Sequence, residues 1–153
     1  MKKFLLGAAC GIVCLPSIAA DTWVVSGVSK TLLILYDQTT MEINKNIRGT
    51  WTVTVWPTNM EGLDYVLGWQ EFDCKNKKSR LTMGYPGIFG KSLGKQVLKS
   101  ATKWDRIPPG SVLDDTLVIV CAKEPAKGVS LASHEEAAKL GRGYLRGYLN
   151  AQM

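Results

Sequence analysis

Residues 47–56 alternate between two kinds of side chain more regularly than any other stretch of the chain. The odd positions are Ile47, Gly49, Trp51, Val53 and Val55, and the even positions are Arg48, Thr50, Thr52, Thr54 and Trp56. An extended strand points successive side chains to opposite faces, so the mostly apolar odd positions share one face. A strand with one apolar face needs neighbouring strands and a covering layer, and the chain must therefore build a packed sheet.

Shorter apolar or alternating runs, separated by turn residues, predict further strands. These runs span residues 22–26, 32–36, 39–43, 63–74, 79–85 and 95–101. The runs at 63–74 and 79–85 flank a lysine-rich turn and predict an antiparallel pair. Residues 57–62 are expected to interrupt the strand pattern, and residues 86–94 to form an ordered loop.

The pattern changes after the prolines and glycine at 108–110. Ser111 stands three residues before Asp114, which is the spacing of a helix N-cap with an acidic first turn. A helix is therefore predicted over residues 112–122. The β-branched residues at 118–120 leave a strand as the alternative.

A second capping pattern, Ser133 with Glu136, predicts a C-terminal helix. One side is expected to carry the apolar residues Ala137, Leu140, Tyr144, Leu145, Tyr148 and Leu149, and the other the basic residues Lys139, Arg142 and Arg146. Three glycines inside the helix each cost up to about 1 kcal/mol relative to alanine, so it needs a surface to pack against. We expect that surface to be its own sheet; the alternatives are a partner, a second copy or a membrane.

Residues 1–20 have the composition of a secretory signal peptide. Lys2 and Lys3 precede an apolar run at 4–15, and the small residues Ser17, Ala19 and Ala20 follow. The run is about a dozen residues, short of the roughly 20 that cross a bilayer as a helix, so we expect removal after Ala20. Removal after Ala19, or a lipid anchor at Cys10 or Cys14, is the alternative. The mature chain is expected in the periplasm or on the outer surface of a Gram-negative bacterium.

Only Cys74 and Cys121 remain after the leader is removed. In an oxidising compartment this pair predicts one intramolecular bridge, closing a loop of about 48 residues and stabilising the fold by about 4 kcal/mol. The alternatives are two buried thiols or a metal pair. A zinc site needs about four ligands and the chain has a single histidine, His134, so no metal is predicted.

These elements predict an α+β fold with a single antiparallel β-sheet of about six strands, packed with a short helix and a C-terminal helix and closed by one disulfide. After the signal peptide, residues 21–123 are expected to form the domain. Residues 124–153 follow as a linker and an amphipathic helix.

The loss of Lys2 and Lys3 lowers the formal net charge from +6 to +4. The densest basic cluster consists of Lys75, Lys77, Lys78 and Arg80. Such a cluster attracts polyanions such as glycans, nucleic acid or lipid headgroups, and its simpler interpretation is a solvated hairpin turn. Because no basic stripe is interleaved with aromatic residues, we predict no specific nucleic-acid partner.

The sequence carries no arrangement typical of an enzyme. It has no GxSxG elbow and no phosphate-cradling glycine loop, and the predicted bridge consumes both cysteines. His134 opens the last helix, whose positive end lowers its basicity. The acidic pairs at 114–115 and 135–136 also lie at helix starts, where negative charge is stabilising. We predict neither catalysis nor a cofactor.

Several residues between 23 and 121 stand in a distinctive order. They are Tyr36-Asp37, Trp56, Phe72-Asp73-Cys74, Arg80, Trp104, Pro109-Gly110-Ser111 and Cys121. In order and spacing they resemble the bacterial surface-adhesin E family of small exported domains. The resemblance implies an antiparallel sheet with helical packing and a Cys74–Cys121 bridge. It also implies adhesion, since the namesake binds host extracellular-matrix and plasma proteins such as vitronectin, laminin and plasminogen.

Two functions follow from these observations. The first is an exported non-enzymatic binding domain, whose candidate surface comprises Lys75, Lys77, Lys78, Arg80, Lys139, Arg142 and Arg146. The second is a periplasmic structural or accessory subunit that docks through its C-terminal helix and has no external ligand.

Overall fold

The computed structural model describes residues 20–98 and 100–152, so the predicted leader lies outside the described residues except for Ala20. The elements are β1 (Asp21–Val28), β2 (Leu33–Asp37), β3 (Glu42–Asn44), β4 (Ile47–Met60), β5 (Leu63–Asp73), β6 (Lys78–Gly87), β7 (Asp105–Arg106), α1 (Val112–Val120), β8 (Val129–Leu131) and α2 (His134–Asn150). Within this part of the chain, no helix combines the length and apolarity that a bilayer crossing requires.

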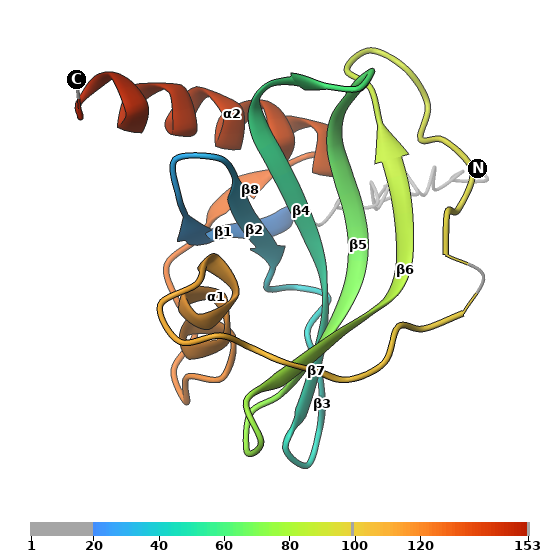
Figure 1. The fold of residues 1–153 in the computed structure, drawn as a ribbon, viewed down its shortest axis with the longest axis vertical. Coiled ribbons are helices and arrows are strands. Elements are labelled where there is room, and N and C mark those ends of the chain that lie inside the picture. The colour runs from blue at the N-terminus through green and yellow to red at the C-terminus, as the bar shows by residue number, and fades with distance from the viewer. Residues whose placement is uncertain (1–19, 99, 153) are drawn as a thin grey trace, which may run out of the picture.

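The strands form one antiparallel sheet in the order β7-β6-β5-β4-β2-β1-β8, and β3 pairs with β4 beyond the end of β2. Figure 1 shows β4, β5 and β6 as long curved strands, with α2 across one end of the sheet and α1 beside β1 and β2. The predicted α+β class is confirmed, with eight strands rather than about six. The additional strands β7 and β8 have two and three residues, too few to show a periodic pattern.

Strand β4 continues through the segment predicted to interrupt it, so that prediction was wrong. The turn consists only of Glu61 and Gly62, which have positive φ angles of 51° and 86°, as a two-residue type I′ hairpin turn requires. Met60 pairs directly with Leu63 across this turn. Pro57 is tolerated because the pairing of β4 with β5 is irregular between Val55 and Met60, where no ladder hydrogen bond needs its missing N–H.

The strand predicted over residues 95–101 does not form in its described residues, 95–98 and 100–101. This segment instead runs beside β6 and touches it at separate points. The N–H of Val97 donates to the Gly84 carbonyl at 2.9 Å, and that of Thr102 to the Leu81 carbonyl at 2.8 Å. The two acceptors are three residues apart on β6, whereas the two donors, Val97 and Thr102, are five residues apart, so a regular ladder cannot form.

Both predicted helices form, and both begin at the predicted caps. The Ser111 side chain accepts the Asp114 N–H at 3.2 Å, and the Ser133 side chain accepts the Glu136 N–H at 3.2 Å. Packing of residues 112–120 against β1 and β2 therefore overrides the β-branched composition of this segment, and the alternative of a strand is wrong.

The helices cover opposite faces of β1 and β2. Trp23 and Leu35 belong to the apolar cluster that packs against α2, whereas their neighbours Val24 and Tyr36 belong to the cluster that packs against α1. Successive residues of a strand point to opposite faces, so the sheet lies between two separate cores. The predicted Cys74–Cys121 disulfide is present, with a Cα–Cα distance of 5.7 Å, and ties the end of β5 to the end of α1.

Helix α2 packs on its own sheet, as expected, and Ala137, Leu145, Tyr148 and Leu149 of the predicted apolar side contact the core. The contact line is shifted from the predicted one, however. Its buried residues are Ala137, Ala138, Gly141, Arg142 and Leu145. Leu140 and Tyr144, predicted to be covered, are 42% and 53% exposed. The helix lies so close to the sheet that only small side chains fit between them. Leu140 and Tyr144 therefore lie on the side of the helix that faces away from the sheet.

The close approach of α2 predicts opposite effects for the same substitution at two of its glycines. A Cβ on Gly141 would lie 2.7 Å from the Leu35 Cδ1 and 3.2 Å from the Val55 Cγ2, whereas one on Gly147 meets nothing within 4 Å. Gly141→Ala should therefore lower the unfolding free energy by about 1–3 kcal/mol through overpacking. Gly147→Ala should raise it by up to about 1 kcal/mol through helix propensity. Urea denaturation of both variants measures the difference, and equal shifts would refute this packing.

Candidate functional site

A cluster of basic side chains stands at the turn between β5 and β6. Asp73 shapes this turn: its carboxylate accepts the N–H of Lys75 at 3.1 Å and that of Asn76 at 3.0 Å. Hydrogen bonds from the Asn76 side chain and backbone are the main cause of a lowered pKa of Asp73, so the turn is held by a charged carboxylate. Lys75 and Lys77 lie on the turn and Lys78 begins β6, and all three lysines are exposed.

Strand β7 adds a cation that the sequence did not indicate. Arg106 pairs with Lys78 in the β6–β7 ladder, and the Ile107 N–H donates to the Lys77 carbonyl at 3.0 Å. We call Lys75, Lys77, Lys78 and Arg106 the basic tip. None of the four makes an ion pair within 4.0 Å with another residue of the described chain. No periodic signal could have placed Arg106 here, because a two-residue strand has none.

The other predicted basic residues do not join the basic tip. Arg80 forms an ion pair with Glu71 and lies 4.6 Å from the ring centroid of Trp104. Lys139 pairs with Glu135 at 2.7 Å, and Arg146 donates to the Pro57 carbonyl at 3.0 Å. Figure 1 shows α2 and the β5–β6 turn at opposite ends of the sheet, so the structure separates the two predicted basic groups.

Arg142 is a buried structural residue, although the sequence predicted it on an exposed basic face. Its guanidinium donates to the Asp64 carboxylate at 2.7 Å, to the Asp64 carbonyl at 2.6 Å and to the Trp56 carbonyl at 3.1 Å. It also lies 4.6 Å from the ring centroid of Phe89. This single side chain therefore joins α2 to β4, to β5 and to the loop after β6.

The Asp64 carboxyl is charged despite its burial. Burial alone raises its pKa, but hydrogen bonds from the Phe89 N–H, Arg142 and Asn59 outweigh burial and hold the pKa below its ordinary value. The Phe89 N–H bond measures 2.9 Å and the Asn59 bond 3.2 Å. The carboxylate is thus fully engaged within the protein, which makes it a structural group rather than a candidate acid or base.

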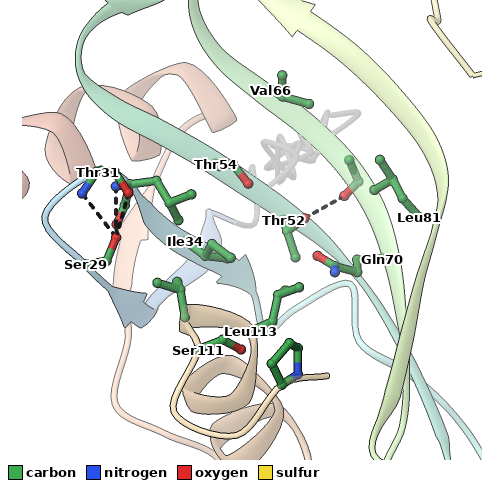
Figure 2. Close-up of a pocket in the computed structure, with 14 residues that line it drawn as sticks. Ser29, Thr31, Ile34, Thr52, Thr54, Val66, Gln70, Leu81, Ser111 and Leu113 are labelled. Atoms are coloured by element: carbon green, nitrogen blue, oxygen red, sulfur yellow. Dashed lines mark hydrogen bonds between the residues drawn. The ribbon is translucent and has the colours of Figure 1, made fainter. Parts of the chain in front are cut away.

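The largely apolar hollow that we call the α1 groove lies where α1 leaves the sheet uncovered. It has a volume of about 540 Å³, and Figure 2 shows it between β2, β4 and β5, with the beginning of α1 as one wall. Its lining includes Ile34, Thr54, Val66, Gln70, Leu81 and Leu113. Pro108 lines both this groove and a neighbouring hollow of about 890 Å³ formed by Lys75, Lys77 and Arg106. The groove and the basic tip are therefore adjacent.

The side chains considered for catalysis have structural partners. Asp114 accepts the Gly110 N–H at 2.9 Å, and Glu136 accepts the Ala132 N–H at 2.9 Å. Burial lowers the pKa of His134, although Glu135 and Asp21 oppose this effect. The predicted weak basicity of His134 thus has burial as its main cause. Within residues 20–98 and 100–152, no three His, Cys, Asp or Glu side chains gather into a metal site.

Comparison with known proteins gives one result. The family model described as "Surface-adhesin protein E" matches residues 23–122. The matched region begins at the third residue of β1 and includes β2 to β7, α1, both bridged cysteines, the basic tip and the α1 groove. It ends before β8 and α2. No curated protein and no solved structure matches the chain.

The Asp64–Arg142 ion pair predicts a pH-dependent stability. Because the folded pKa of Asp64 is lowered, its contribution is complete above the unfolded value of about 3.9 and is lost as the pH falls through the folded value. Asp64→Asn should lower the unfolding free energy at pH 7 by about 2–3 kcal/mol and reduce the loss of stability below pH ~4. Urea denaturation from pH 7 to pH 2 measures both.

The more exposed ion pair between Glu71 and Arg80 supplies the control. Its side chains are 22% and 32% exposed, so Glu71→Gln should cost less than about 1 kcal/mol. A loss from Glu71→Gln as large as that from Asp64→Asn would show that burial does not set the strength of these pairs.

Proposed function

The chain belongs to the surface-adhesin protein E family, and from that premise we propose that it is a non-enzymatic adhesin binding host extracellular-matrix or plasma proteins. Membership of the family implies an exported protein with extracellular partners. The proposal adds the class of partner, for which the family resemblance suggests vitronectin, laminin and plasminogen as the first proteins to test.

The observation that supports this proposal is the basic tip. Three lysines and an arginine stand together on a short turn and strand, exposed and without intramolecular ion pairs in the described chain. Concentrated positive charge raises the rate at which an acidic partner surface is encountered and favours its orientation toward the tip. The turn is held rigid by Asp73, which reduces the ordering cost of binding.

Three further elements belong to the same proposal. The leader at 1–20 is removed during export, residues 21–123 form the adhesin domain, and residues 124–153 act as a C-terminal extension. The extension supplies the cover for one sheet face through Ala137, Ala138 and Leu145, which supports a structural role for it. The family also supports the proposal that the domain has no catalytic activity.

A second candidate function is that of a periplasmic accessory subunit that docks through α2. It is favoured by Leu140 and Tyr144, two large apolar side chains exposed on the outer side of that helix. Such a surface suits a protein partner. The two functions place the chain on different sides of the outer membrane.

Charge reversal at the basic tip tests the adhesin proposal. The triple variant Lys75→Glu, Lys77→Glu and Lys78→Glu should weaken binding to immobilised vitronectin, laminin or plasminogen by about tenfold or more, because it replaces attraction by repulsion. Surface plasmon resonance at two salt concentrations measures this. The matched control reverses three exposed lysines elsewhere, Lys91, Lys95 and Lys127, with the same change in net charge. Equal weakening by both triples would refute a specific role for the tip.

The location is tested with a protease added to intact bacteria. Cleavage of the protein without lysis is expected for an adhesin on the outer surface. A periplasmic marker protein must remain intact in the same cells. Full protection of the chain until the outer membrane is permeabilised would favour the accessory subunit.

A further inference from the structure

The α1 groove is an apolar part of the sheet face that no helix covers. Helix α1 has only nine residues and packs on β1 and β2, so the same face of β4, β5 and β6 continues beyond it without a helix. Ile34, Val66, Leu81 and Leu113 give this surface its apolar character. At about 540 Å³ the groove is within the range of roughly 300–1,000 Å³ typical of ligand sites.

Polar groups on the floor distinguish a peptide from a lipid chain as the occupant. The Thr52 hydroxyl is already used, since it donates to the Gly68 carbonyl at 3.2 Å. Thr54 and Gln70 line the groove and make no side-chain hydrogen bond within the described residues. An acyl chain over them would bury these groups without partners, at a cost of about 1–3 kcal/mol each. The amide groups of a peptide backbone satisfy them.

The charged residues near the groove indicate the charge of the ligand. Lys75, Lys77 and Arg106 line the hollow that meets the groove at Pro108. No aspartate or glutamate lines either hollow. A ligand that reaches from one to the other therefore meets an apolar surface at one end, and at the other a hollow lined by cations and by no carboxylate.

We propose that the α1 groove and the basic tip together bind an extended peptide segment in which two or three apolar residues are followed by acidic residues. The apolar side chains lie against Val66, Leu81 and Leu113, the backbone bonds to Thr54 and Gln70, and the carboxylates reach Lys77 and Arg106. This inference rests on the proposed function, since it names the kind of segment that the extracellular partner presents.

Fluorescein-labelled synthetic peptides provide the test on the chain from Asp21 to Met153. The probe carries Leu-Val-Leu followed by Asp-Glu-Asp; one control replaces the apolar half by serines and another the acidic half by lysines. Fluorescence anisotropy should show binding of the probe that is at least about tenfold tighter than binding of either control, and that weakens as salt is added.

Two pairs of variants place the peptide in the groove. Thr54→Trp and Gln70→Trp fill the groove, and each should weaken probe binding by about tenfold. The control is Thr58→Trp, which lies on the exposed end of the same strand as Thr54 and should leave probe binding unchanged. Lys77→Glu combined with Arg106→Glu should weaken it similarly, whereas Lys91→Glu should not. Circular dichroism melting shows which variants are folded, and having two groove-filling variants keeps the test decisive if one fails to fold.

Besides a probe that does not bind at all, three results would overturn the inference. The first is probe binding that the folded groove-filling variants leave unchanged. The second is groove-dependent binding of dodecanoate with none of the peptide, which would identify a lipid site. The third is a concentration-dependent dimer that both groove-filling variants abolish, which would identify a second copy as the occupant. If the peptide does not bind while immobilised laminin or vitronectin does, only this inference fails; if neither binds, the proposed function fails as well.

Discussion

The structure depends on the burial of β2 from both sides. All five residues of this strand, Leu33–Asp37, are buried, and Leu33 and Leu35 have no exposed surface at all. A strand that is apolar on one face needs one covering layer, whereas β2 needs two. The chain supplies them with α1 and α2, which follow β1 to β7 in the sequence. The sheet therefore lacks its full cover until the last residues of the chain have packed.

The two helices are held by different means. The Cys74–Cys121 bridge fixes the end of α1 to β5, and the Arg142–Asp64 ion pair fixes α2 to the opposite end of that strand. A charge pair of this kind is stabilising only when hydrogen bonds satisfy its remaining atoms. Here the Phe89 N–H and the Trp56 carbonyl do so. Strand β5 thus connects both helices to the sheet.

The candidate binding surface arises because the helices cover only part of the sheet. Nine residues of helix extend over about 14 Å, whereas strands lie about 4.8 Å apart, so α1 cannot cover a sheet of eight strands. The uncovered part becomes the α1 groove, and the turn that follows β5 places lysines beside it. Helix α2 has 17 residues and covers its face more fully. Its small residues form the contact, so Leu140 and Tyr144 stay exposed on its outer side.

Local sequence patterns determined the elements and the chemistry of the surface. The alternation at 47–56 predicted β4, the caps at Ser111 and Ser133 predicted both helices, and two remaining cysteines predicted one bridge. The lysines of the basic tip were also visible, because polar residues between two apolar runs form a turn. Each of these signals arises within a few neighbouring residues, where periodicity and capping act.

Only the tertiary structure decided which of these residues meet. Asp64 and Arg142 are 78 residues apart, and no local sequence pattern predicts that they pair. Arg106 joins the lysines through a two-residue strand, and Gly141 brings α2 close enough to turn Leu140 outward. The segment at 95–101 has the composition of a strand, but Val97 and Thr102 bond to β6 out of register with each other. Contacts of this kind depend on the distance and register between packed elements, which hydrophobic periodicity along a single segment does not encode.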